Sequence, residues 1–151
     1  MSRAAVWAAT LGPLGWWPLG PGTLASALVA AGWWWTSPAR AVTLAAAAAI
    51  ALVGTFVAGV ADRELGRDDG RIVIDEAAGM AIALVGVPAS LAGAAVAFAL
   101  FRILDIGKPP PISWCETVRG GTGVMLDDVV AGTVAALLGA AAFAAWPTLT
   151  G

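Results

Sequence analysis

Long uncharged stretches alternate with two short charged segments along this chain. Within residues 4–61, Arg40 is the one charged residue, whereas residues 62–76 carry nine charged side chains. Residues 77–101 carry none, residues 102–128 carry seven, and no charge follows. Uncharged apolar segments of this length are typical of helices that enter or cross a membrane. The pattern therefore predicts apolar helices joined by two charged connections.

The apolar segments predict several helices, and two of them are clear candidates for full membrane spans. Ala41–Ala61 provides 21 apolar residues and Val129–Trp146 provides 18, which suits about 30 Å of hydrocarbon. The cluster Trp33–Trp35 resembles the aromatic belt found at membrane surfaces. The expected helices are Leu24–Trp35, Ala41–Ala61, Ile74–Val85, Ala89–Ile106 and Val129–Trp146.

The middle segment admits two arrangements: one tilted span over residues 77–104, or a hairpin broken at Gly86–Pro88. We predict the hairpin because Gly-x-Pro is a natural turn. The hairpin also brings the Gly/Pro-rich loop Gly12–Thr23 and both charged segments to one side of the membrane. Seven of the eight basic residues then share that side and Arg40 alone lies opposite, which makes the charged side cytoplasmic by the positive-inside rule.

Composition narrows the class of protein. The chain has 151 residues, of which 60% are hydrophobic and 12% are charged, whereas soluble domains carry about a quarter charged residues. A net charge of −2 without a basic field argues against nucleic-acid binding. We therefore expect one domain over residues 1–151, with its N-terminal segment retained. Its predicted class is all-α: a compact polytopic membrane bundle of about four to five transmembrane or half-spanning helices, with charged loops on the cytoplasmic face.

Five carboxylates lie in or near the two charged segments, and the hairpin brings them to one membrane face. They are Asp75, Glu76, Asp105, Asp127 and Asp128. Each adjacent acid pair also fits a helix N-terminus, where a carboxylate complements the helix dipole. Five acids in one place repel one another, however, and a divalent cation relieves that repulsion. Hard oxygen ligands of this kind suit Mg²⁺, so we predict a magnesium site with the number of ions left open.

Three charges recur at intervals of three residues where the middle apolar segment ends. Arg102, Asp105 and Lys108 share roughly one side of a helix, which Pro109 then ends. Charges at the end of an apolar helix need a partner or a function. Arg102 could bind a phosphate through two nitrogen atoms, and Lys108 could add a point charge.

Two further stretches could contact an anion. Pro21-Gly22-Thr23 opens the first helix with free backbone N–H groups and a hydroxyl, although Thr23 could equally act as the helix N-cap. Gly120–Gly123 is either a flexible anion-binding backbone or an ordinary connecting loop. Thr23 is therefore a candidate substrate-binding residue beside Arg102 and Lys108.

Missing residue types exclude several enzyme classes. The chain contains no histidine, which excludes histidine nucleophiles and histidine-based triads. A cysteine-dependent phosphatase loop needs an arginine six positions after its cysteine. The one cysteine of this chain, Cys115, has Gly121 at that position. A carboxylate or an activated water must therefore handle protons in any hydrolysis.

Four motifs together resemble the phosphatidylglycerophosphatase A family, and they run in order from about Gly12 to Gly132. The resemblance implies an all-helical, Mg²⁺-dependent integral membrane phosphatase. Its substrate would be phosphatidylglycerophosphate, converted to phosphatidylglycerol on the cytoplasmic side of the bacterial inner membrane among membrane lipids. The motifs are Pro18-x-x-Pro21-Gly22-Thr23-x-x-Ser26, Ile72-Val73-Ile74-Asp75-Glu76-x-x-Gly79, Phe101-Arg102-Ile103-Leu104-Asp105-x-x-Lys108-Pro109-x-Pro111-Ile112 and Gly120-Gly121-x-Gly123-Val124-Met125-x-Asp127-Asp128-x-x-Ala131-Gly132.

Two other functions remain open at this point. A CDP-alcohol phosphotransferase would share the metal and the lipid headgroup, and Asp69-Gly70-Arg71 matches the start of its signature, but Ile74 stands where that signature needs arginine. A small ion or solute transporter would place its acids near the middle of the bilayer. In this chain the acids are expected at one membrane surface.

Overall fold

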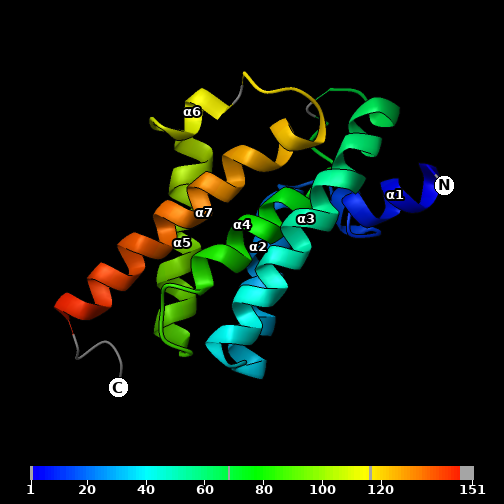
Figure 1. Cartoon of the computed structure of the whole chain (residues 1–151). Coiled ribbons are helices and arrows are strands. Elements are labelled where there is room, and N and C mark those ends of the chain that lie inside the picture. The colour runs from blue at the N-terminus through cyan, green and yellow to red at the C-terminus, as the bar shows by residue number, and fades with distance from the viewer. Residues whose placement is uncertain (1, 68, 116, 147–151) are drawn as a thin grey trace.

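The computed structural model describes residues 2–67, 69–115 and 117–146, and these residues form helices without any strand (Figure 1). The predicted all-helical class is therefore confirmed for this part of the chain. Asp68 and Glu116 of the charged segments lie outside it. The elements are α1 Ser2–Ala9, the 3₁₀ helix η1 Leu14–Trp16, α2 Pro21–Thr36, α3 Arg40–Leu65, α4 Ile74–Leu84, α5 Leu91–Gly107, α6 Ile112–Cys115 and α7 Gly120–Ala145.

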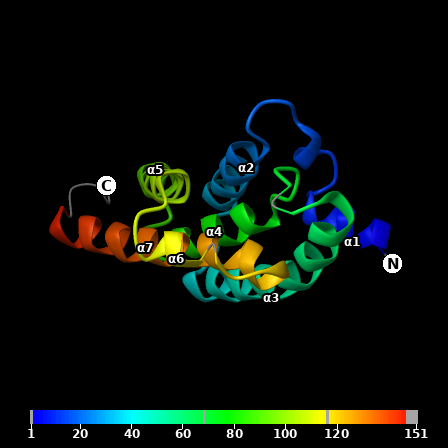
Figure 2. The same cartoon turned by 90° about the horizontal axis from the view of Figure 1, so that it is seen from above.

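The short helix α4 forms the centre of the molecule. Eight of its eleven residues are buried, and it packs against α2, α3, α5 and α7. Figure 2 shows α2 and α5 on one side of α4, with α3 and α7 on the other. Met80 and Leu84 of α4 are fully buried with Phe101 of α5 in the main apolar core. The burial of α4 explains why its sequence is apolar on every face after the first turn.

The predicted hairpin in the middle segment is confirmed. Helix α4 ends at Leu84, and α5 begins at Leu91 after a turn that contains Gly86–Pro88. The side chain of Ser90 caps α5 by accepting a hydrogen bond of 3.0 Å from the backbone nitrogen of Gly93. The chain therefore returns along α4, and the two charged segments meet at one end of the bundle.

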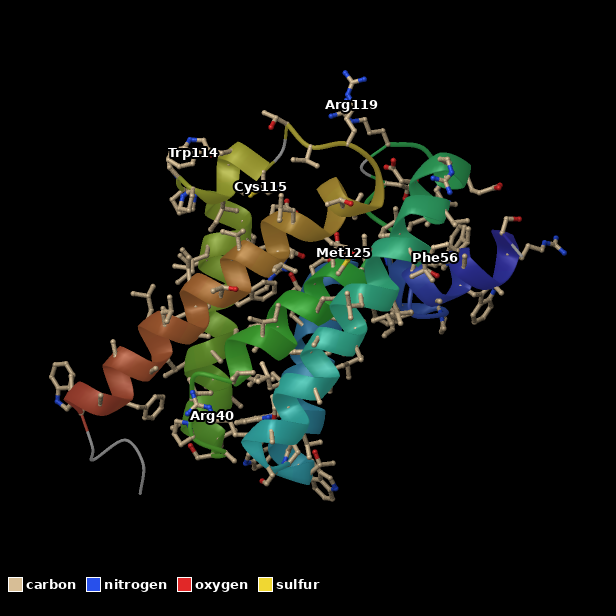
Figure 3. The ribbon with its side chains drawn as sticks, viewed as in Figure 1. Arg40, Phe56, Trp114, Cys115, Arg119 and Met125 are labelled. Carbon is tan, nitrogen blue, oxygen red and sulfur yellow. The ribbon has the colours of Figure 1, made fainter. Side chains whose placement is uncertain are left out.

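Two basic residues that the hairpin expects on opposite sides, Arg40 and Arg119, lie at opposite ends of the bundle (Figure 3). Figure 3 shows Arg40, at the start of α3, at the opposite end from Arg119. Trp114 and Cys115 lie at the same end as Arg119. The end that contains Arg119 is called the charged end below.

Within the described residues, two helices are long and apolar enough to cross a membrane. Helices α3 and α7 each have 26 residues. The most apolar 18-residue window has a mean hydropathy of 2.2 in α3 and 1.8 in α7. Twenty-six residues extend about 39 Å. Only 33% of each window is buried inside the protein, and large apolar side chains such as Leu52, Phe56 and Leu137 are exposed. A helix buried in a soluble core would not expose such residues.

Helix α7 begins earlier than predicted, at Gly120 instead of Val129. A Cβ atom on Gly121 would lie 2.0 Å from the carbonyl oxygen of Thr55 and 2.6 Å from the backbone nitrogen of Gly59. The first turn of α7 therefore packs its backbone directly on α3. The expectation that Gly120–Gly123 forms a loop was wrong, because these glycines allow two helices to approach closely.

Candidate active site

A close crossing of α4 and α7 positions the acidic residues. A Cβ atom on Gly132 of α7 would lie 2.2 Å from the carbonyl oxygen of Gly79 of α4. Asp75 precedes Gly79 by four residues, and Asp128 precedes Gly132 by four residues, so each acid lies one helical turn above the crossing on the same face. The two glycines thereby bring carboxylates from separate helices together.

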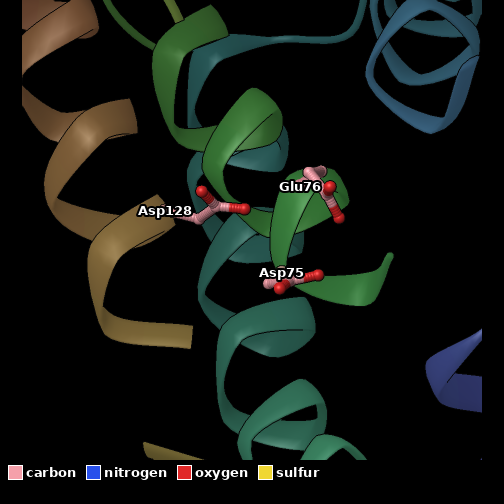
Figure 4. Close-up of side chains that lie close together, drawn as sticks. All are labelled: Asp75, Glu76 and Asp128. Atoms are coloured by element: carbon pink, nitrogen blue, oxygen red, sulfur yellow. The ribbon is translucent and has the colours of Figure 1, made fainter. Parts of the chain in front are cut away.

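The carboxylates of Asp75, Glu76 and Asp128 form one group. Their nearest oxygen atoms all lie within 4.8 Å of one another, and Figure 4 shows Asp128 reaching from α7 toward the two acids of α4. Asp128 is only 3% exposed. Among the described residues, one buried oxygen of Asp75 (Oδ1) and one of Glu76 (Oε2) have no hydrogen-bond partner. Buried charges of like sign without partners are costly, and this set of hard oxygen ligands fits a divalent cation.

Only one of the two adjacent acid pairs lies at a helix N-terminus, where its charge would complement the helix dipole. Asp75 and Glu76 lie in the first turn of α4, as expected. Asp127 and Asp128 lie about two turns inside α7, because that helix begins at Gly120. The interpretation of Asp127-Asp128 as helix-start acids was therefore wrong, since the dipole acts within the first turn.

The other two predicted acids form ion pairs with the predicted basic residues. Asp105 accepts a hydrogen bond of 2.5 Å from Nη1 of Arg102, and Asp127 accepts one of 2.7 Å from Nζ of Lys108. Asp105 also lies close enough to Glu76 for their charges to interact. The structure thus divides the five predicted carboxylates into two sets. Three form the group, and the other two lie beside that group and bind the side chains of Arg102 and Lys108.

Thr23 contacts Arg102 and does not cap α2. The N-cap of α2 is Gly20, which has a φ of 58° and provides no side-chain hydrogen bond. The hydroxyl oxygen of Thr23 accepts a hydrogen bond of 3.1 Å from Nη2 of Arg102. The guanidinium group of Arg102 therefore bridges α2 and Asp105 of its own helix, α5.

Gly22 has a role that sequence interpretation missed. A Cβ atom at this position would lie 1.8 Å from Oε1 of Glu76. The start of α2 therefore passes against the carboxylate of Glu76, and only glycine leaves room for it. The signal was present in Pro21-Gly22-Thr23, but Gly22 was interpreted there as a source of free backbone N–H groups.

A cavity of about 480 Å³ opens onto the acids at the charged end. All five predicted carboxylates and Lys108 line it, whereas Thr23 and Arg102 lie outside its wall. The sequence interpretation did not select Arg67 or Asp69, although both belong to the first charged segment. The cavity is lined by Arg67, Asp69, Gly70, Ile72, Asp75, Glu76, Asp105, Lys108, Val118, Gly123, Val124, Asp127 and Asp128.

The loop between α3 and α4 is fixed by an ion pair on the cavity wall. Nε and Nη2 of Arg71 donate hydrogen bonds of 2.7 and 2.5 Å to Asp69. The hydrogen bonds from Arg71 hold the pKa of Asp69 below its ordinary value. The Arg71 guanidinium also lies 4.6 Å from the ring centre of Trp16, and the backbone nitrogen of Val73 donates to Ala9. These contacts connect this side of the cavity to α1 and η1.

Curated relatives of this chain include named lipid phosphatases. The chain is 41% identical over 87 residues to phosphatidylglycerophosphatase A of Escherichia coli (strain K12), which covers 56% of this chain and 51% of that protein. It is 39% identical over 90 residues to the Haemophilus influenzae protein of the same name, covering 58% and 55%. The match thus spans about half the length of these two relatives. A putative phosphatidylinositol-3-phosphatase of Bacteroides thetaiotaomicron is 36% identical over 133 residues, covering 82% of this chain and 84% of that protein.

A family model gives the most extensive match. The model described as phosphatidylglycerophosphatase A matches residues 7–143, which include every candidate site residue discussed above. No solved structure matches the chain. The family match and the two long apolar helices indicate a membrane protein. The chain belongs to the phosphatidylglycerophosphatase A family.

Proposed function

We propose that this protein removes the terminal phosphate of phosphatidylglycerophosphate, producing phosphatidylglycerol and inorganic phosphate. The observation that carries the proposal is the group formed by Asp75, Glu76 and Asp128 at the base of a cavity, in a chain of this family. A phosphomonoester brings two negative charges to a site already rich in carboxylates. The reaction therefore requires cations on both sides of the phosphate.

The three grouped carboxylates are the proposed ligands of Mg²⁺. One or two Mg²⁺ ions would bind there. Asp75 and Glu76 each present a buried oxygen without a partner, and Asp128 faces them from α7. Asp105 and Asp127 line the same cavity and complete the predicted set of catalytic acids. When bound, a divalent cation neutralises phosphate charge and activates water for attack.

The basic residues of the site are proposed to hold the phosphate. Lys108 lines the cavity, where Asp127 keeps its ammonium group in place. Arg102 is held by Asp105 and Thr23 at the neighbouring edge, and its buried Nε has no hydrogen-bond partner in the described part of the chain. A phosphate oxygen could accept from Arg102 there, because the planar guanidinium group is oriented in advance.

Proton transfer must use carboxylates or water because the chain contains no histidine. Asp105 is the proposed proton acceptor, since it lines the cavity and lies close to Glu76 without belonging to the group of three. Its ion pair with Arg102 would orient the carboxylate. The same residue thereby couples the phosphate-binding arginine to the acids.

The proposed location is the bacterial inner membrane, with the charged end facing the cytoplasm. Helices α3 and α7 would cross the bilayer beside α2 and α5, while α4, at 11 residues or about 17 Å, would reach only halfway. Asp128 lies in the third turn of α7, about 12 Å from the start of the helix. That depth suits a lipid headgroup at the membrane surface and argues against a transporter with acids at the midplane.

The test is phosphate release by the purified protein in detergent. We expect release from phosphatidylglycerophosphate with Mg²⁺, loss of release with a chelator, and recovery when excess Mg²⁺ is returned. Activity that survives complete chelation would refute the metal-dependent mechanism. A nucleotide-dependence control distinguishes hydrolysis from phosphotransfer to or from a CDP-alcohol.

A second substrate is favoured by one relative. The Bacteroides thetaiotaomicron protein bears the name putative phosphatidylinositol-3-phosphatase and matches most of this chain. Both substrates present a phosphomonoester on a lipid headgroup, so the same acids could act on either. Phosphatidylinositol 3-phosphate therefore belongs in the assay, and a higher kcat/KM on it would reassign the substrate while leaving the site unchanged.

A further inference from the structure

An apolar groove runs between α2 and α5, away from the acidic cavity. It has a volume of about 290 Å³ and is lined almost entirely by apolar surface. Ala30 and Ala94 form its buried floor, at 7% and 5% exposure. Small residues usually allow two helices to close on each other, but here the space between the helices remains open.

The wall contributed by α2 is continuous with the polar contact at the charged end. Ala27, Ala31 and Trp34 line the groove and follow Thr23 at four, eight and eleven residues. These intervals place all four residues on one face of a helix. Thr23, which holds Arg102, therefore stands at the upper end of this wall.

On α5, the residues that line the groove also share a helix face with the polar residue at the charged end, but there they precede it in the chain. Phe98, Ala95 and Leu91 line the groove and precede Arg102 by four, seven and eleven residues. They share a helix face with Arg102. The hydrogen bond between Arg102 and Thr23 therefore lies about one helical turn beyond Ala27 and Phe98, the lining residues nearest the charged end, while Trp34 and Leu91 flank the far end of the groove.

The groove and the polar pair beyond it together extend over about one leaflet of a membrane. The lining residues of α2 run from Ala27 to Trp34, about 10 Å along the helix, and Thr23 lies one further turn away, about 17 Å from Trp34. Half of a hydrocarbon core of about 30 Å is about 15 Å. An apolar groove of about 10 Å, with a polar pair one turn beyond it toward the charged end, suits part of an extended acyl chain whose headgroup lies at that pair.

We propose that the groove between α2 and α5 holds an acyl chain of the lipid substrate, with the headgroup phosphate at Arg102 and Lys108. This inference rests on the proposed lipid phosphatase function and adds a determinant of substrate specificity. The groove would orient the lipid so that its phosphate reaches the cavity, and it would favour long-chain lipids over short-chain or soluble phosphate esters. Binding energy from the remote chain would thus contribute to catalysis at the headgroup.

The experiment compares two substrates on variants that fill the groove. Ala31→Phe and Ala95→Phe each add a large side chain at an exposed position on one wall. We expect the ratio of kcat/KM on dioleoyl to kcat/KM on dihexanoyl phosphatidylglycerophosphate to fall about tenfold, the scale on which a blocked apolar pocket discriminates. The matched control is Ala48→Phe, at an exposed position of α3, for which this ratio should stay at the wild-type value.

Photolabelling of the wild-type protein tests the proposal without any variant, and therefore still applies if a groove-filling variant fails to fold. Dioleoyl substrate with a photoactivatable group in one acyl chain should label peptides of α2 and α5 in the wild-type protein. Labelling that falls mainly on α3 and α7 would overturn the proposal.

Each other outcome also has one meaning. An unchanged ratio in both filled variants of an active enzyme would refute the groove and leave the phosphatase function intact. Failure of the wild type to hydrolyse either lipid would instead refute the proposed function. Equal loss on both lipids, together with a changed oligomeric state by light scattering, would show that a second copy of the chain occupies the groove, and this would overturn the proposal.

Discussion

At the scale of single residues, the site depends on buried carboxylate oxygens that have no hydrogen-bond partner among the described residues. Asp75 and Glu76 each bury an oxygen without a hydrogen bond, while Arg102 and Lys108 are held by other acids. Arg102 and Lys108 thereby stay near the proposed phosphate position while their closest ion pairs are with acids outside the group of three carboxylates. Substitutions at the two kinds of acid should therefore have different effects.

Asp128→Asn should lower turnover at least about 100-fold and raise the Mg²⁺ concentration needed for half-maximal rate, because it removes a charged ligand. Asp105→Asn should lower turnover strongly with little change in Mg²⁺ requirement, because Asp105 holds Arg102 and lies outside the group of three. Phosphate release across a Mg²⁺ titration measures both effects. Glu64→Gln is the control, since Glu64 is an exposed carboxylate outside the cavity. Wild-type turnover in both site variants would remove the proposed site.

Gly22→Ala tests the contact between α2 and Glu76. The added methyl group would lie 1.8 Å from Oε1 of Glu76, so either the carboxylate or the start of α2 must move. We expect a loss of activity of at least about tenfold, on the scale of misplacing a group at an active site. Gly32→Ala in the same helix meets no atom within 4 Å and should retain full activity. Equal activity of the two variants would contradict the assigned role of Gly22.

At the scale of helices, glycine contacts set the register between α7 and its neighbours. Gly121 packs against Gly59 of α3, and Gly132 packs against Gly79 of α4. Both contacts are between backbones, so the helices cannot slide or rotate without a clash. The positions of Asp75 and Asp128 therefore follow from packing one turn away from the acids themselves.

Gly132→Ala should destabilise the protein and reduce activity together. Its Cβ atom would lie 2.2 Å from the backbone oxygen of Gly79, which cannot move as a side chain can, and overpacking of this kind costs about 1–3 kcal/mol. Thermal unfolding in detergent measures the change. Thr133→Ala is the adjacent control, because Thr133 is exposed and should alter stability by less than about 0.5 kcal/mol. A Gly132→Ala protein as stable and active as the wild type would exclude the crossing as the positioning contact.

At the scale of the whole molecule, the arrangement of helices gathers the charges at one end. Arg40 lies at the other end (Figure 3), and the apolar faces of α3 and α7 are exposed between the two ends. Exposed apolar faces of this kind mark a surface for contact with a membrane. The uneven distribution of basic residues then favours one orientation in the membrane.

Cysteine labelling tests that orientation. In intact cells, a membrane-impermeant maleimide should label the Gly70→Cys variant and the native Cys115 to the same extent, because both positions lie at the charged end. Ala39→Cys, in the turn before α3, should show the opposite accessibility; this variant and Gly70→Cys are made in a Cys115→Ser background. We expect external reagent to reach only position 39, as the positive-inside rule requires. Opposite accessibility of positions 70 and 115 would exclude the arrangement of crossings.

The sequence alone determined the helical class, the turn at Gly86–Pro88, the clustering of charges at one end and the choice of five acids. These features follow from local properties: the length of apolar segments, the breaking of helices by glycine and proline, and the cost of placing charge in lipid. The matching motifs added the family. Each of these inferences uses residues that are near one another in the chain.

Only the tertiary structure decided which acids meet, which are paired, and where α7 begins. Asp75 and Asp128 lie more than fifty residues apart, and their distance depends on a rotation and register between helices that Gly79 and Gly132 fix through backbone contact. The fit of Gly22 against Glu76 and the groove between α2 and α5 depend on packing in the same way. A sequence shows which residues can tolerate close packing, but the contacts that use this tolerance arise only when the helices pack together.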